Sequence, residues 1–327
     1  MCYTTYDIYS ITPRMALKIL FMGTPDYAAN YLCELIQAER RPFAVITQPD
    51  RPTGRDKHIE PTPVKRVAMK NGIETYQPSD IRDPEWAEKI RKLAPDIIVV
   101  VAFGQIIPKS ILEIPLKGCI NVHPSLLPKY RGASPLQAAI LNGDADTGVT
   151  IMRMDEKMDH GPILAQETIR LDTRESIQSL GEKTTTLGVK LLLTVLKHIE
   201  NDTINSKEQN HSQATYTKLL KLEDGKIDFM QESADKIDRK IRALNPEPGT
   251  WTMLQGRRLK ILEAHPLSNS DATDTMKKGL FIVLNENQKI LCARCTLGII
   301  QLNKVQLEGK KQMSGVEFVH GNAKLLK

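Results

Sequence analysis

An amide, an imidazole and a carboxylate occur at positions from which they could act together on an acyl group. Asn121 and His123 end a short apolar run, 118–123, that predicts a β-strand. Because side chains two residues apart on a strand share a face, we expect Asn121 and His123 to project together. Both can then hydrogen-bond a developing oxyanion, as acyl transfer requires. The alternative is structural: His123 caps the strand and Asn121 binds loop amides.

A carboxylate would orient this imidazole, as in other catalytic triads. Asp159 is the candidate, since it follows a predicted strand over 148–154 and precedes the turn at Gly161-Pro162. Asp155 is a neighbouring rival, and an Asx turn ahead of the Gly-Pro pair is the structural alternative.

Strands alternate with helices through the first two thirds of the chain. The predicted strands cover 17–22, 43–47, 74–76, 96–102, 118–123 and 148–154, and the predicted helices cover 28–36, 63–70, 84–93, 135–141 and 176–200. This alternation predicts an α/β, Rossmann-like domain with a mainly parallel twisted sheet covered on both faces. Ligands of such sheets bind beyond the carboxyl ends of the strands, which is where Asn121 and His123 fall.

The first strand–helix turn argues against nucleotide binding. It holds Gly23 but neither the Gly-x-Gly-x-x-Gly of dinucleotide folds nor a phosphate-binding loop. We therefore expect neither NAD nor ATP at this turn. The segment 48–58 that follows the second strand is too rich in Pro, Gly and charge to predict regular structure.

The pattern changes beyond residue 216. One amphipathic helix over 233–244 precedes five short strands within 250–307, which predicts a small OB-like β-barrel. We expect four parts: a disordered tail or upstream start over 1–14, a catalytic domain over 15–203, a polar linker over 204–216, and a C-terminal domain over 217–327.

Positive charge is concentrated in the last third of the chain. Residues 209–327 hold 19 Lys or Arg and 13 Asp or Glu, whereas the remainder holds 26 of each. This asymmetry indicates a polyanionic partner for the C-terminal domain, with a solvated basic surface as the alternative.

Composition excludes several broad classes of protein. With 41% hydrophobic and 26% charged residues among 327, the chain is not disordered throughout. No apolar run reaches about 18 residues, so we expect no membrane span. Five scattered cysteines and the absence of a secretory signal favour the cytoplasm. Cys292 and Cys295 alone do not make a zinc site, so we expect no metal.

Several motifs resemble one family. Residues 102–108, 118–132 and 158–163 match, in order and spacing, the formyltransferases that use 10-formyltetrahydrofolate. Residues 20–26, 47–57, 214–216, 227–229 and 245–250 are similar to the methionyl-tRNA formyltransferases within that group. The resemblance covers nearly the whole chain. It implies transfer of a formyl group from 10-formyltetrahydrofolate to the amino group of methionyl initiator tRNA.

The same resemblance implies roles for individual residues. It makes Asn121, His123 and Asp159 catalytic, and it implies a folate-binding segment of Ser125, Leu126, Leu127, Pro128, Phe103, Gly104 and Gln105. The implied tRNA contacts are Arg51, Arg55 and Lys57 in the inserted loop and Arg257, Arg258 and Lys260 in the C-terminal domain. We expect a monomer without a metal. A related formyltransferase or hydrolase acting on a small molecule, and an RNA-binding module without activity, are the alternatives.

Four positions depart from the pattern of the family. Asp56 replaces an expected Gly, His160 a frequent Thr, Glu247 a common aromatic residue, and Phe229 the usual Trp. None of these positions belongs to the predicted catalytic set. Asp56 adds an acidic group to a basic loop, so we expect that loop to bind RNA less tightly than it would with glycine at this position.

Overall fold

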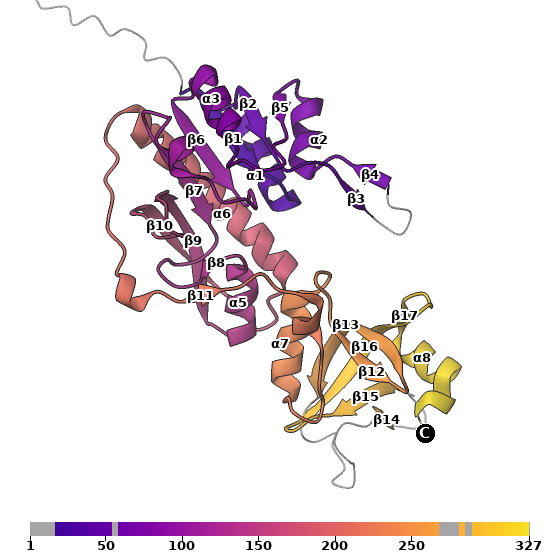
Figure 1. The fold of residues 1–327 in the computed structure, drawn as a ribbon. Helices are drawn as coiled ribbons and strands as arrows, with labels where there is room; N and C mark the ends of the chain where they lie inside the picture. The colour runs from indigo at the N-terminus through magenta and orange to yellow at the C-terminus, as the bar shows by residue number, and fades with distance from the viewer. Residues whose placement is uncertain (1–16, 54–57, 268–280, 285–289, 327) are drawn as a thin grey trace, which may run out of the picture.

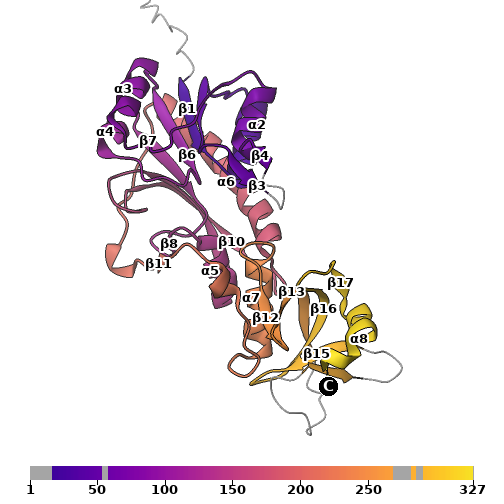
Figure 2. The same cartoon turned by 45° about the vertical axis from the view of Figure 1, so that its right-hand side comes forward.

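The computed structural model describes residues 17–53, 58–267, 281–284 and 290–326, which form two domains (Figure 1). The predicted tail 1–14 and the loop residues Arg55, Asp56 and Lys57 lie outside the described residues. Figure 2 shows the larger N-terminal domain above the smaller C-terminal one, with helix α7 (Ala234–Leu244) at their junction.

A seven-stranded sheet forms the centre of the N-terminal domain. Its order is β10-β9-β7-β6-β1-β2-β5, with the bounds β1 (Ile19–Gly23), β2 (Ala44–Ile46), β5 (Glu74–Tyr76), β6 (Ile97–Val101), β7 (Cys119–His123), β9 (Asp146–Arg153) and β10 (Ile163–Arg170). The strands from β7 to β5 run parallel, and β9 and β10 are antiparallel additions at one edge. The predicted mainly parallel, Rossmann-like sheet is confirmed.

Helices cover both faces of this sheet. They are α1 (Asp26–Gln37), α2 (Pro63–Lys70), α3 (Pro84–Leu93), α4 (Lys109–Leu112), α5 (Pro135–Asn142) and α6 (Ile177–Glu200). Alternate residues of β1 serve the two faces, since Phe21 joins the core beneath α1, α2 and α6 while Leu20 joins the core beneath α3 and α4. Burial on both faces explains why the central strands are continuous apolar runs.

The inserted segment after β2 is more regular than its composition predicts. Strands β3 (Arg51–Thr53) and β4 (His58–Glu60) pair antiparallel, with Pro52 opposite Ile59. The prediction of irregular structure over 48–58 is therefore wrong for 51–53 and for residue 58, whereas 48–50 have no regular structure. A two-stranded ribbon tolerates Pro52 because a proline without an N–H can face an unpaired edge.

The segment predicted as a linker lies along the N-terminal domain. Lys207 and Ile163 exchange two main-chain hydrogen bonds of 2.8 Å, and the short helix η1 (His211–Gln213) follows. Strand β11 (Tyr216–Thr217) then pairs parallel with β8 (Arg131–Gly132). Figure 1 shows β11 beside β8, well before the chain enters α7.

Antiparallel strands build the C-terminal domain. Five strands have the order β12-β13-β16-β15-β14, and β17 pairs with β16; the elements are η2 (Leu222–Gly225), β12 (Trp251–Leu254), β13 (Arg257–Leu267), β14 (Phe281–Leu284), β15 (Ile290–Arg294), β16 (Ile299–Leu307), β17 (Met313–Ser314), α8 (Gly315–Asn322) and η4 (Ala323–Leu326). The five predicted short strands are confirmed, and they pair antiparallel, while closure into a barrel stays a prediction.

Helix α7 joins the two domains. Its Ala243 and Leu244 share an apolar cluster with Ile140 of α5 and Leu180 of α6. Asp238 of α7 is 5% exposed and pairs at 2.7 Å with Arg174, which precedes α6. These contacts fix the basic domain at one end of the sheet.

Candidate functional site

Strand β7 places two of the predicted residues on one face at the carboxyl edge of the sheet. Val122, between them, points the other way into the apolar core. His123 is only 4% exposed and Asn121 is half-buried. The flanking strands β6 and β9 fix the direction of β7 through parallel and antiparallel pairing. The expected juxtaposition of Asn121 and His123 follows from this pairing.

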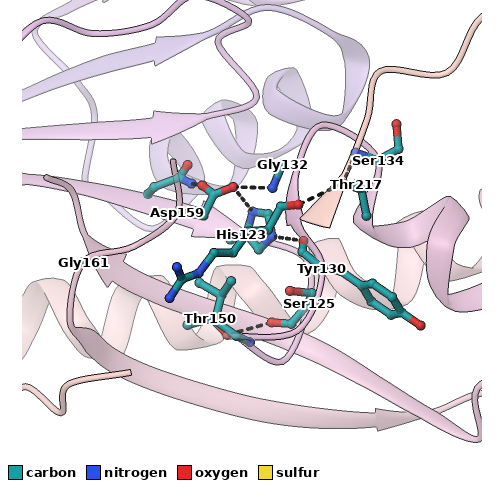
Figure 3. Close-up of polar contacts among 12 residues, drawn as sticks. His123, Ser125, Tyr130, Gly132, Ser134, Thr150, Asp159, Gly161 and Thr217 are labelled. Atoms are coloured by element: carbon teal, nitrogen blue, oxygen red, sulfur yellow. Dashed lines mark hydrogen bonds and ion pairs between the residues drawn. The ribbon is translucent and has the colours of Figure 1, made fainter. Parts of the chain in front are cut away.

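Asp159 meets both of these side chains. It lies in the loop between β9 and β10, and Asn121 Nδ2 donates to its Oδ1 at 3.4 Å. Its Oδ2 is 3.7 Å from His123 Nδ1 and accepts a 2.7 Å hydrogen bond from the Gly132 N–H. The structure therefore brings the amide, the imidazole and the carboxylate together (Figure 3).

The orientation of the imidazole depends on a main-chain group as well. His123 Nε2 is 2.9 Å from the Tyr130 carbonyl oxygen, which can only accept, so Nε2 donates. The separation of 3.7 Å between Nδ1 and Asp159 exceeds a hydrogen bond, so the carboxylate acts on the ring through its charge. Tyr130 is thus the ring's hydrogen-bonded partner, and Figure 3 shows it opposite Asp159.

Gly132 occupies a position where only glycine fits. Its φ is +104°, and a Cβ there would lie 2.3 Å from the Thr217 carbonyl oxygen of β11. The close approach of β11 leaves the Gly132 N–H aimed at Asp159. A side chain at this position would displace either the strand or the donor.

The segment after β7 uses much of its predicted folate-binding set for its own structure. Ser125 Oγ donates to the Lys129 carbonyl at 2.6 Å. Thr150 Oγ1 donates to the Ser125 carbonyl at 2.6 Å and accepts from the Leu127 N–H at 3.2 Å. Ser125 and Leu127 are buried, whereas Leu126 and Pro128 are half-buried.

At the end of β6 too, the predicted folate-binding residues use their side chains or carbonyls to hold the segment itself. The Phe103 side chain is 2% exposed, and its carbonyl accepts from Thr24 Oγ1 and Gln48 Nε2 at 2.8 and 3.1 Å. Gln105 is bound to the Pro78 carbonyl and the Ile81 N–H. Gly104 is exposed with a φ of +84°. At residues 103–105, main-chain groups rather than side chains are therefore left to contact a ligand.

Two further residues support the site and lack a signal in the sequence. Gln209, in the predicted linker, donates to the carbonyls of Asp159 and Gly161. Arg131 is 1% exposed and donates to Gln209 Oε1. Beside them, His160 and His211 stack with ring centroids 3.9 Å apart. Gln209 stands in a polar run without periodicity, so only the folded chain shows it to be buried.

The predicted RNA-binding residues stand apart from this cluster. Arg51 is exposed at the start of β3, while Arg55 and Lys57 lie outside the described residues. Arg258 on β13 has its guanidinium carbon 4.6 Å from the Trp251 ring centroid. Lys260 is exposed on the same strand, and Arg257 donates to the Glu308 carbonyl at 2.7 Å.

The cysteine pair is built into the second domain. Cys292 and Cys295 are buried, and burial raises the pKa of each thiol to about 12. Thiols in this state are poor metal ligands, because metals bind the thiolate. Over the described residues, no three His, Cys, Asp or Glu side chains group as a metal site. No helix in the described part of the chain is long and apolar enough to cross a membrane.

Both domains match families of known proteins. Residues 17–196 match the family described as formyl transferase, and residues 219–323 match the formyl transferase C-terminal domain. Methionyl-tRNA formyltransferase of Lachnospira eligens is 43% identical over 94% of this chain and 97% of its own length. That of Geobacter metallireducens is 41% identical over 93% of this chain and 96% of its own.

Solved structures share the fold at low identity. HypX from Aquifex aeolicus in complex with tetrahydrofolic acid has a TM-score of 0.66 and 17% identity, over 96% of this chain and 48% of that one. This chain thus spans about half the length of HypX. An N-formyltransferase from Helicobacter canadensis has a TM-score of 0.62 and 20% identity, over 88% and 98% of the two chains. Both domain matches and the near full-length relatives agree: the chain belongs to the methionyl-tRNA formyltransferase family.

Proposed function

We propose that this protein transfers the formyl group of 10-formyltetrahydrofolate to the free amino group of methionyl initiator tRNA. Membership of the family supports the reaction and both substrates. The observation that carries the proposal is the convergence of Asn121, His123 and Asp159 beyond the end of β7. Two neutral or cationic hydrogen-bonding groups beside one carboxylate suit acyl transfer to an amine.

The residues present fit a folate donor. The exposed main chain at Ala102 and Gly104 and the half-buried Leu126 and Pro128 flank the end of β6 and β7. Main-chain groups can hydrogen-bond the edge of a pterin, while the apolar side chains contact its face. We assign Ser125 and Gln105 a supporting role, since their side chains already hold the two segments.

The reaction exchanges one carbon–nitrogen bond for another. The methionyl amine forms a bond to the formyl carbon, the formyl oxygen takes up negative charge, and the bond from carbon to folate N10 then breaks. Asn121 Nδ2 and His123 stabilise that oxygen, and each such donor lowers the barrier by about 3 kcal/mol. His123 acts as the imidazolium, through the hydrogen on Nδ1, since Nε2 already donates to the Tyr130 carbonyl.

Proton movement falls to the carboxylate. The attacking amine loses one proton and folate N10 gains one, so the products are formylmethionyl-tRNA and tetrahydrofolate. While ionised, Asp159 stabilises positive charge on the neighbouring imidazole as the formyl oxygen becomes negative. As the bond to folate N10 breaks, Asp159 passes the amine proton to N10, directly or through one water molecule. The Gly132 N–H keeps this carboxylate in place.

Binding of tRNA divides between the two domains. We assign Arg51, Arg55 and Lys57 to the acceptor end, and Arg257, Arg258 and Lys260 to the phosphates of the stem. Lysine and arginine contacts to phosphate supply affinity through counterion release. We infer a catalytic domain over 15–203, a connecting segment over 204–216 and an RNA-binding domain over 217–327. We infer a monomer, since a single chain holds both the catalytic cluster and the basic domain. We also infer that the protein acts in the cytoplasm.

The test offers the purified protein 10-formyltetrahydrofolate with three RNAs. These are methionyl initiator tRNA, methionyl elongator tRNA and uncharged initiator tRNA. We expect formylation of the first alone. Formylation of a small amine or amino sugar, with all three tRNAs inert, would contradict the proposal and favour a small-molecule formyltransferase. Release of formate without any acceptor would favour a hydrolase.

A further inference from the structure

A buried amide connects the segment between the domains to the Asp159 turn. Gln209 is 5% exposed. Its Nε2 donates to the Asp159 carbonyl at 3.0 Å and to the Gly161 carbonyl at 2.7 Å. One side chain therefore fixes the main chain at the residue that carries the carboxylate and again two residues later.

The opposite end of this amide is held by a buried cation. Arg131 donates to Gln209 Oε1 from Nη2 at 2.6 Å and from Nε at 3.2 Å. A guanidinium has no acceptor, so the oxygen of Gln209 must face it and the nitrogen must face the two carbonyls. Arg131 also donates to His211 Nδ1 at 2.9 Å. Gln209 thus has a single orientation and uses both of its amide hydrogens.

The turn that Gln209 holds has left-handed backbone at the residue that carries the carboxylate. Asp159 has a φ of +47°, in the left-handed region, which is costly for most residues other than glycine and which Asp tolerates better than most. Gly161 is the second residue of the turn whose carbonyl accepts a hydrogen bond from Gln209. A Cβ at Gly161 would lie 2.0 Å from the Arg153 carbonyl oxygen. The turn is therefore pressed against the end of β9 and needs a partner on its other side.

We propose that Gln209 is a positioning residue for formyl transfer. Its Nε2 holds the left-handed conformation of Asp159, and that conformation directs the carboxylate toward Asn121, His123 and the Gly132 N–H. The segment predicted as a linker therefore completes the catalytic geometry. This inference rests on the proposed function, because it assigns Gln209 an effect through Asp159.

The direct test is Gln209→Glu, which keeps the acceptor for Arg131 and removes the donor. A carboxylate oxygen then faces two carbonyl oxygens, so the turn shifts while the tie to Arg131 persists. We expect kcat for formyl transfer to fall about 10- to 100-fold, as misplacement of a catalytic group by about 1 Å does. KM for tRNA and for the formyl donor should stay within about threefold, because Gln209 contacts neither substrate in the proposal.

A matched control lies on the same segment. Gln213 is exposed in η1, so Gln213→Glu makes the identical change without touching the turn and should leave kcat within about twofold. Gln209→Met, which is apolar and of similar length, provides a second variant if Gln209→Glu does not fold. It should lower kcat in the same way.

A double-mutant cycle separates positioning from general damage. If Gln209 acts through Asp159, adding Gln209→Glu to Asp159→Asn should lower kcat by less than about threefold further. Full additivity of the two losses would overturn the inference. So would a folded Gln209 variant with wild-type kcat, or a loss carried only by KM for tRNA. An inactive wild-type protein would instead refute the proposed function, which keeps the two failures distinct.

Discussion

The candidate catalytic cluster and the candidate RNA-binding surface are built in opposite ways. His123 and Asp159 have side chains only 5% and 14% exposed, and main-chain groups of Tyr130 and Gly132 hold them. Arg51 and Lys260 stand exposed on strands. Donors that stabilise a transition state act only at hydrogen-bond distance, so they must be preorganised. Attraction between charges extends over about 8–10 Å at physiological salt, so it needs no fixed geometry.

Removal of one preorganised donor should have the largest effect. Asn121→Ala deletes the amide that faces Asp159, and kcat should fall about 10²- to 10³-fold, as for other oxyanion donors. Steady-state kinetics measure kcat, and filter binding measures the Kd for tRNA, which should not change. An equal loss of tRNA affinity would make Asn121 a structural residue instead.

The contact between the two regions comes next in size. Asp238 pairs with Arg174 of the first domain at 2.7 Å and with Arg242 at 2.8 Å. Asp238→Asn leaves both guanidinium groups without their charged partner. We expect the free energy of unfolding to fall by about 1–3 kcal/mol, toward the lower end because Arg174 is half exposed. Chemical denaturation measures this change, and an unchanged unfolding midpoint would show that the charge of Asp238 does not stabilise the junction of the domains.

Single surface charges should have smaller effects, confined to binding. Lys260→Gln should raise the Kd for tRNA a few-fold and reduce the slope of log K against log salt by about 0.7–0.9, the value for one phosphate contact. Lys190→Gln is the matched control, since Lys190 is also exposed but lies on α6. Identical salt slopes for both variants would remove Lys260 from the RNA-binding surface.

Low pH should slightly weaken the docking of segment 207–217 onto the N-terminal domain. Desolvation by the side chains packed against the ring lowers the pKa of His211, although the residue is exposed. The charges of His160, Arg131 and Lys157 lower it further, while that of Glu208 raises it. The undocked segment therefore takes up its proton first, so docking is complete above about pH 6.5 and weakens as the pH falls below that value.

Hydrogen exchange over 207–217, corrected for intrinsic rates, should rise between pH 7.5 and 5.5. His211→Gln keeps an acceptor for Arg131 and should abolish the rise. The same rise in that variant would assign the pH dependence to another group.

The alternation of the first domain could be predicted because its central strands are buried on both faces. Apolar runs end sharply where such strands end, and the predicted strands 96–102 and 118–123 lie within one residue of the bounds of β6 and β7. Strand β10 was not predicted, since Gln166, Glu167 and Thr168 are exposed at the edge of the sheet and have the composition of a loop. Its partner β9, not its own composition, makes it a strand.

The candidate site divides along a similar line. Asn121, His123 and Asp159 could be predicted from side-chain chemistry and strand periodicity. The Tyr130 carbonyl and the Gly132 N–H could not, because main-chain groups have no residue-type signature. Gln209 could not be predicted either, because it is buried by residues such as Asp159 and Gly161 that are distant from it in the sequence.

The most direct test of the division between chemistry and binding is the single-turnover rate of formyl transfer at saturating methionyl initiator tRNA. The rate is measured for the wild-type protein and for the variants Asn121→Ala and Lys260→Gln, each in the presence of excess 10-formyltetrahydrofolate. We predict that Lys260→Gln reaches the wild-type rate once tRNA saturates, whereas Asn121→Ala stays about 10²- to 10³-fold slower at any tRNA concentration. A wild-type rate for Asn121→Ala would contradict the assignment of the chemistry to this cluster.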